Sequence, residues 1–336
     1  MAQFYLLPRS LATRFPRLAR MAQAIEARCV QVLFWCMQRL SPERATGLAR
    51  ALFGFFGPLS ERARKAERNL AVAFPERDAD WRRDTVREIF RSLGESAAEL
   101  IKLEQIWRER DERIRFSIDP QSQAIIDRRQ PIVFVCAHVG AWQLTNLIAR
   151  HTGLTISVVI ARESNPLMQR SMQRLRSAFG VGLIPKEAGV RPLMRELRAG
   201  HCVGLATDTR LRTGTPLPFF GRDALTNTTA ARLALRNGAA LIPIHCERLG
   251  GSRFHVRVLA PLWGQAQSGP DATKEPDTTT GFNPRKEPEP AEGPEVSEDL
   301  ALALSRQINQ QFEAWIRAAP GQWICLKRRW PDAHKM

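Results

Sequence analysis

Five short runs rich in β-branched residues, spaced by segments of helix length, constrain the fold of this chain more than any other feature. The runs lie at residues 132–136, 156–160, 202–206, 241–245 and 254–259. Segments of helix length lie between the earlier runs, at 165–179 and 192–199. Strands that alternate with helices build parallel sheets covered by helices. The pattern therefore predicts an α/β fold with a mostly parallel central sheet flanked by helices.

The N-terminal third of the chain has a helical pattern instead. Over residues 20–115 this pattern is interrupted at three prolines, Pro42, Pro58 and Pro75, and proline starts or ends helices. We therefore divide the chain into an N-terminal helical region, residues 1–115, and an α/β domain, residues 116–330.

A segment of different composition interrupts the α/β domain at residues 265–298. It is rich in Pro, Gly, Thr and Glu and holds almost no large apolar side chain. Such a segment cannot bury enough surface to order itself, so we expect a flexible insertion that serves as a spacer. An amphipathic helix is predicted after it, at residues 300–316.

The charge of the chain indicates an anionic partner. Its 50 Lys and Arg against 34 Asp and Glu give a net charge of +16, and arginine dominates. Guanidinium groups bind phosphate and carboxylate in a bidentate geometry, so phospholipid head groups, a phosphorylated lipid, an acidic carrier protein or nucleic acid suit this composition. The sequence has no recognised nucleic-acid-reading motif, and we expect no nucleic-acid partner.

The cysteines and histidines do not have the spacing of metal ligands. The six cysteines are scattered without a CxxC pair, which argues against structural zinc and against a disulfide framework. Their distribution favours a reducing cytoplasmic setting, and no metal is expected.

The N-terminal region is suited to lie on a membrane without crossing it. Its most apolar stretch, residues 29–37, has about half of the roughly 20 residues that cross a bilayer. Residues 1–70 carry 12 Arg and Lys against four Glu. Apolar faces flanked by arginines lie in the plane of an anionic leaflet, which predicts a membrane-associating region. The alternative is a set of ordinary amphipathic helices that pack on the domain.

Residues 131–150 carry the most chemical information. The predicted strand at 132–136 delivers His138 to its carboxyl end, Gly140 permits a tight turn, and a helix predicted to begin near Ala141 carries Gln143 in its first turn. Ligands of open α/β sheets bind beyond the carboxyl ends of the strands. His138 is therefore placed to act as a base, provided that a neighbour fixes its tautomer.

Five blocks in order resemble the lipid A lauroyl and myristoyl acyltransferase family, within the lysophospholipid acyltransferase superfamily. They are RKAERNLAVAFPERD (64–78), HVGAWQ (138–143), ARESNP (161–166), the segment 206–245 with its PFFG, and WIRAAPGQWICLKRRW (315–330). HVGAWQ stands where the family has its H-x4-D/E box.

The resemblance implies an acyltransferase that moves a fatty acyl chain from acyl carrier protein to a hydroxyl of a phosphorylated glycolipid, a lipid A precursor, at the cytoplasmic face of the inner membrane. It implies His138 as general base and Gln143 at the position of the residue that orients it, with no metal or organic cofactor. The substrate-binding residues that we predict are Arg162, Asn165, Asp208, Thr209, Phe220, Gly221, Arg328 and Arg329.

Two positions depart from the family pattern. Gln143 replaces a carboxylate, and Thr209 stands where the family usually has Gln. An amide oxygen can accept the imidazole N–H but cannot supply the charge that stabilises an imidazolium; Glu163 or Asp208 could supply it instead. The alternatives are a catalytically weakened or inactive lipid-binding relative, and an acyltransferase that acts on a lysophospholipid or an aminolipid.

Overall fold

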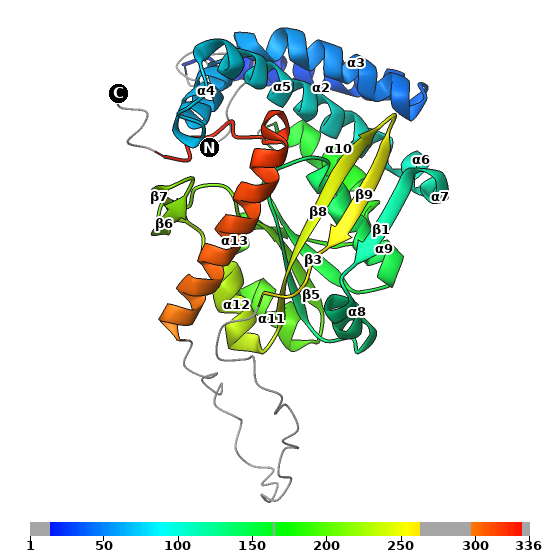
Figure 1. Ribbon diagram of the computed structural model, residues 1–336. Helices are drawn as coiled ribbons and strands as arrows, with labels where there is room; N and C mark the ends of the chain where they lie inside the picture. Colours follow the sequence, from blue (N-terminus) through cyan, green and yellow to red (C-terminus); the bar gives the residue numbers. More distant parts are fainter. Residues whose placement is uncertain (1–13, 164, 263–296, 331–336) are drawn as a thin grey trace, which may run out of the picture.

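The computed structural model describes residues 14–163, 165–262 and 297–330 and is built around a seven-stranded sheet (Figure 1). The order across the sheet is β1-β9-β8-β2-β5-β3-β4. Its strands are β1 (Ile114–Ile118), β2 (Ile132–Cys136), β3 (Ile156–Ile160), β4 (Gly182–Pro185), β5 (Cys202–Ala206), β8 (Ala240–Gly250) and β9 (Arg253–Val258). Strands β8, β2, β5, β3 and β4 are parallel, whereas β9 is antiparallel to β8. The carboxyl ends of these five strands therefore lie at the same end of the sheet, which we call its carboxyl edge.

The predicted α/β class and mostly parallel sheet are confirmed. Strands β2, β3 and β5 have the predicted bounds, and β8 and β9 contain or overlap the last two runs. The sequence pattern did not predict β1, β4 or the hairpin of β6 (Thr215–Phe219) and β7 (Arg222–Thr226), which forms a separate two-stranded sheet.

Helices cover both faces of the sheet. The helical segments are α2 (Pro16–Gln38), α3 (Pro42–Phe56), η1 (Gly57–Leu59), α4 (Glu61–Ala73), α5 (Ala79–Ile101), α6 (Leu103–Arg108), α7 (Arg110–Arg113), α8 (Pro120–Asp127), η2 (Trp142–Leu147), α9 (Ile148–Thr152), α10 (Pro166–Ser177), η3 (Lys186–Ala188), α11 (Arg191–Arg198), α12 (Thr229–Asn237), α13 (Glu298–Ala318) and η5 (Pro320–Gln322). All three predicted interruptions fall at or next to helix ends.

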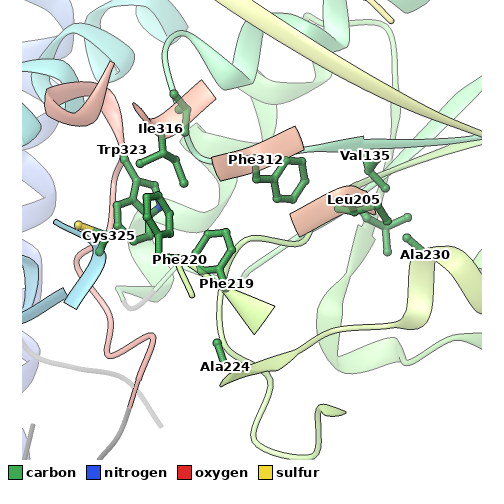
Figure 2. Packing of buried hydrophobic residues seen from close by; sticks show 14 of the residues in the cluster. Val135, Leu205, Phe219, Phe220, Ala224, Ala230, Phe312, Ile316, Trp323 and Cys325 are labelled. Atoms are coloured by element: carbon green, nitrogen blue, oxygen red, sulfur yellow. The ribbon is translucent and has the colours of Figure 1, made fainter. Parts of the chain in front are cut away.

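Alternate residues of the central strands enter two different cores. Val133 and Val135 join the cluster formed with α4, α11, α12 and α13, whereas Ile132 and Phe134 join the one formed with α6, α8 and α9. Burial on both faces explains why β2 is a continuous apolar run. Figure 2 shows part of the first cluster, in which Phe312 lies between the sheet and the aromatic side chains around Trp323.

The N-terminal helices gather at the end of the molecule where β8 ends (Figure 1). A buried ion pair fixes α5 there, with Arg248 Nε of β8 lying 2.6 Å from Glu99 Oε1. The same guanidinium donates to the Ser92 and Ser96 hydroxyls. The carboxyl edge of the sheet is therefore tied to this helical layer by charge-assisted hydrogen bonds.

A helix begins next to Ala141, as predicted, but its first turns are 3-10 and not α-helical. The chain forms the 3-10 helix η2 from Trp142 and becomes α-helical only at Ile148. The Ala141 N–H donates to the Cys246 carbonyl at 3.0 Å, so its backbone is held by β8 before the helical turns start. Gln143 therefore does not occupy the first turn of an α-helix.

The helix predicted at 300–316 is confirmed as α13. The insertion predicted at 265–298 lies outside the described residues except for its last two positions. Within the described ranges, no helix combines the length and the apolarity needed to cross a bilayer.

Candidate active site

Two neighbouring strands bring His138 and Asp208 together. Each residue lies two positions beyond the end of its strand, and β2 and β5 pair in register with Cys136 opposite Ala206. The Nδ1 atom of His138 is 2.6 Å from Oδ1 of Asp208. The side chain of Asp208 is 2% exposed and that of His138 29% exposed, so the pair has a buried acid and an accessible ring.

Asp208 is held in its ionised form. Burial by itself would raise the pKa of its carboxyl, but the adjacent His138 ring and hydrogen bonds from His138 and Trp323 outweigh burial and lower that pKa. The Trp323 Nε1–H donates to Oδ2 at 3.2 Å. An ionised carboxylate at Nδ1 requires the proton on that nitrogen, so the neutral form of the ring has its free lone pair on Nε2. This is the tautomer that a general base needs.

The C-terminal segment shapes the loop that carries His138. The Ile324 N–H donates to the His138 carbonyl at 2.8 Å, and the Gly140 N–H donates to the Gln322 carbonyl at 3.3 Å. Gly140 has φ +64°, and a Cβ there would lie 2.4 Å from the Cys246 carbonyl oxygen. Only glycine fits this close approach, as the tight turn predicted at Gly140 requires.

Gln143 does not orient His138, and that prediction was wrong. Its Nε2 donates to the Ser96 carbonyl of α5 at 3.3 Å, because the 3-10 turns of η2 direct this side chain toward α5. The carboxylate at the His138 ring comes from Asp208. The sequence had offered Asp208 both as a substrate contact and, with Glu163, as a carboxylate that could supply the missing charge. Its burial and its contacts with His138 and Trp323 agree with the second of these predictions.

Arg162 and Asn165, two of the predicted substrate-binding residues, differ in exposure: Arg162 is exposed and Asn165 is buried. The Arg162 side chain is 69% exposed, with Nε 3.9 Å from Glu187 Oε2, and it lies beyond the carboxyl end of β3. Asn165 is 4% exposed; it caps α10 and donates to the Gln23 carbonyl of α2 at 2.9 Å. Asn165 thus joins two helices.

The predicted contacts in the PFFG segment lie behind the site. Phe220 and Gly221 form the turn between β6 and β7, both with positive φ. The Phe220 ring is buried and stacks on Trp323 with 6.0 Å between ring centroids (Figure 2). Phe220 therefore supports the tryptophan that bonds Asp208, while Gly221 is exposed at the hairpin turn. Thr209, next to Asp208, is half-buried.

The two predicted arginines of the C-terminal segment also differ. Arg328 is exposed, whereas Arg329 is 2% exposed and donates to the Leu225 carbonyl and the Thr226 hydroxyl. Burial lowers the pKa of Arg329 to about 10. Arg329 therefore holds the β6-β7 hairpin through these hydrogen bonds.

An apolar cavity of about 400 Å³ opens beside His138. Among its lining residues are His138, Trp142 and Gln143 near the sheet edge, Phe34 of α2, Leu100 of α5 and Phe179 after α10. Its wall is mostly aliphatic and aromatic, which suits a hydrocarbon chain. In the described part of the chain, no three His, Cys, Asp or Glu side chains form a group that could hold a metal ion.

Comparison with known proteins places the chain among lipid acyltransferases. The family model for "Bacterial lipid A biosynthesis acyltransferase" matches residues 17–332. A phosphatidylinositol mannoside acyltransferase of Mycolicibacterium smegmatis is 23% identical over 305 residues, 88% of each chain. One from Mycobacterium tuberculosis is 34% identical over 206 residues, covering 59% of this chain and 54% of its own length.

Two further likenesses are more distant. The lipid A biosynthesis myristoyltransferase of Escherichia coli is 24% identical over 152 residues, 44% of this chain and 46% of the relative. The crystal structure of the 1-acyl-sn-glycerophosphate acyltransferase of Thermotoga maritima aligns with 68% of this chain and 91% of its own, with 12% identity and a TM-score of 0.31.

Proposed function

Because the chain belongs to the bacterial lipid A biosynthesis acyltransferase family, we propose that it moves a fatty acyl chain from acyl carrier protein to a hydroxyl of a lipid A precursor or similar glycolipid. The observation that carries this proposal is the His138–Asp208 pair at the mouth of an apolar cavity. The experiment that tests it is transfer from an acyl carrier protein thioester to a detergent-solubilised acceptor, followed by mass spectrometry of the product.

The proposed reaction uses His138 as general base. Its Nε2 takes the proton of the acceptor hydroxyl while the oxygen attacks the thioester carbonyl. The tetrahedral intermediate then collapses, the carbon–sulfur bond breaks, and the imidazolium returns the proton to the leaving thiolate. Asp208 stabilises the imidazolium throughout, because it is a buried carboxylate 2.6 Å from Nδ1. Arg162, exposed at the same edge, is proposed to bind an acceptor phosphate.

The cavity is proposed to hold the acyl chain of the donor. Transfer of hydrocarbon out of water is favoured by about 0.8 kcal/mol for each methylene buried, and the lining is largely apolar. With the tail in the cavity, the thioester carbonyl would lie at its mouth beside His138. The acceptor hydroxyl then needs to approach only from the open side.

We expect Gln143→Glu to change kcat/KM by less than about tenfold, or ~1.4 kcal/mol. The carboxylate that stabilises the imidazolium is already supplied by Asp208, and a glutamate could not donate to the Ser96 carbonyl as Gln143 does. Steady-state assays of the two proteins test this expectation. A much larger gain would instead identify the natural chain as a catalytically weakened relative.

The acceptor has a second candidate of a different lipid class. The relative from Mycolicibacterium smegmatis, named a phosphatidylinositol mannoside acyltransferase, covers 88% of this chain, which favours a glycosylated phospholipid as acceptor. Parallel assays with a lipid A precursor and with a mannosylated phosphatidylinositol separate the two by their kcat/KM.

The site is proposed to face the cytoplasmic leaflet of the inner membrane, in a peripheral or monotopic contact. Exposed large apolar residues follow one face of α2 and continue through α3 into η1, namely Leu18, Met21, Ile25, Val32, Trp35, Leu48, Phe55, Phe56 and Leu59. Exposed arginines lie beside them on α2 and at its C-cap, namely Arg17, Arg20, Arg28 and Arg39. Apolar side chains among guanidinium groups suit an anionic bilayer surface.

The loops of the sheet support the same orientation. Apart from Phe15, which directly precedes α2, the remaining exposed large apolar residues of the described ranges are Leu167, Val190, Leu211 and Leu249. They lie at or beyond the carboxyl ends of β3, β4, β5 and β8. This is the sheet edge that carries His138, so a bilayer contact through these residues would present the cavity mouth to lipid.

Replacing Trp35 and Phe55 together with aspartate is expected to weaken binding to phosphatidylglycerol vesicles by at least roughly tenfold. Burial of one large apolar side chain is worth about 1.5–3 kcal/mol, and both residues are more than half exposed in the protein. Vesicle co-sedimentation measures the change. Gln121→Asp on α8, at the opposite end of the molecule (Figure 1), is the matched control, and equal binding of all three proteins would disprove this orientation.

A further inference from the structure

We infer that Gly204 sets the longest acyl chain that this enzyme accepts. The inference rests on the proposed function, because it takes the apolar cavity as the acyl site. It assigns chain-length selection to one position in the middle of β5.

Strand register places Gly204 in a row of cavity-lining residues. Phe134 of β2 and Val158 of β3 lie opposite Gly204 on its two sides, and all three line the cavity. Phe134 precedes His138 by four residues, about 13 Å along an extended chain. The row therefore lies deep in the cavity, at a distance from the base that is comparable to the length of a fatty acyl tail.

Strand β5, between β2 and β3, carries a glycine where both neighbouring strands carry larger side chains. On the cavity side, Gly204 is followed toward the sheet edge by Ala206, and both are half-buried although the strand is central. Cys202, the preceding residue on that side, is buried. Gly204 is thus the deepest lining residue on β5, and the two small residues form a trough between β2 and β3.

The backbone does not require glycine at this position. Gly204 does not have a positive φ, and it pairs regularly with both neighbouring strands. Glycine in a strand interior is unfavourable because it has no side chain to pack and loses more conformational freedom on folding. The absence of a side chain is explained if the space above Gly204 is kept for a ligand.

A single methyl group at Gly204 would narrow the trough without disturbing the backbone. An added Cβ would meet only the side chain of Val158, with Cγ1 at 3.0 Å and Cβ at 3.8 Å. A valine methyl can give way by the few tenths of an ångström needed. The methyl would then occupy space that the terminal carbons of a long acyl chain would fill.

The test compares Gly204→Ala and Gly204→Val with the natural enzyme, using decanoyl, lauroyl, myristoyl and palmitoyl thioesters of acyl carrier protein. We expect the ratio of kcat/KM between the longest well-used donor and the next shorter one to fall roughly tenfold in Gly204→Ala, since a pocket discriminates by about that factor or more per methylene. Gly204→Val should move the preference further toward short donors. The double variant Gly204→Ala with Val158→Ala should restore long-chain transfer, because it returns more volume than the first substitution removes.

Val203→Ile is the matched control, since it adds one methylene to the same strand but on the opposite face. It should leave the donor ratios unchanged. Unaltered ratios in a folded Gly204→Ala protein, or an equal loss of rate with every donor, would overturn the inference while leaving the acyltransferase proposal intact. Absence of transfer by the natural enzyme from all four donors would instead refute the proposed function. Should Gly204→Val not fold, the ratios of Gly204→Ala and its double variant decide the question.

Discussion

Replacing His138 with alanine is expected to lower the turnover of acyl transfer by roughly 10⁴-fold, the upper range for loss of a positioned general base. His138 is the only residue of the site that combines an accessible ring nitrogen with a buried carboxylate partner. Without the ring, the acceptor hydroxyl must attack the thioester while it still carries its proton. The KM for the donor should change little, because the apolar wall of the cavity remains.

The measurement is turnover with a saturating acyl carrier protein thioester and a detergent-solubilised glycolipid. His151→Ala is the matched control, because His151 is exposed and its ring stacks on Phe116. Turnover in His138→Ala within about tenfold of the natural enzyme would remove the imidazole from the mechanism.

The substitution Asp208→Asn is expected to lower turnover by roughly 10³- to 10⁴-fold, since the equivalent change in serine hydrolases costs about 10⁴. Trp323 determines which way the new amide turns. Its Nε1–H donates to one oxygen of Asp208, so it would hold the amide oxygen and direct the amide NH₂ toward Nδ1 of His138. Nδ1 would then accept a hydrogen bond, Nε2 would carry the proton, and the ring could not act as a base.

This explanation makes a spectroscopic claim besides the kinetic one. Nitrogen NMR of labelled histidine should show the His138 proton on Nδ1 in the natural enzyme and on Nε2 in Asp208→Asn. The substitution changes no volume, so the protein should still fold, and Asp223→Asn on the exposed β6-β7 hairpin is the control. Full activity with an unchanged tautomer would show that Asp208 does not orient the ring.

Strand positions were predictable where both faces of the strand are buried. Strands β2, β3 and β5 lie inside the sheet, so their sequences are short, mainly apolar runs, with Ser157 of β3 as the one polar residue. Strand β4 lies at the edge of the sheet and consists of GLIP, and β6 carries two prolines. Short edge strands and proline-containing strands lack the pattern that identifies a core strand, which explains why these were missed.

The sequence placed His138 at the candidate site and offered Asp208 only as one of two carboxylates that could lie near it. His138 follows a recognisable strand, and this local pattern suffices to place it. Its partner Asp208 is 70 positions away, and their meeting depends on β2 and β5 being neighbours, which the sequence of neither strand specifies. The partners of Arg329 and Asn165 were unpredictable for the same reason, because they lie on remote segments of the chain.

Residues 322–324 form backbone hydrogen bonds with the loop that carries His138, and this has a consequence for the order in which the site is completed during synthesis. These residues follow every strand of the sheet, so the ribosome releases the whole sheet before the segment that gives the His138 loop its final backbone bonds and Asp208 its indole partner. A nascent chain that has already folded its sheet therefore still lacks a finished dyad. The contacts that complete this site are therefore available only after the chain has been synthesised through residue 324.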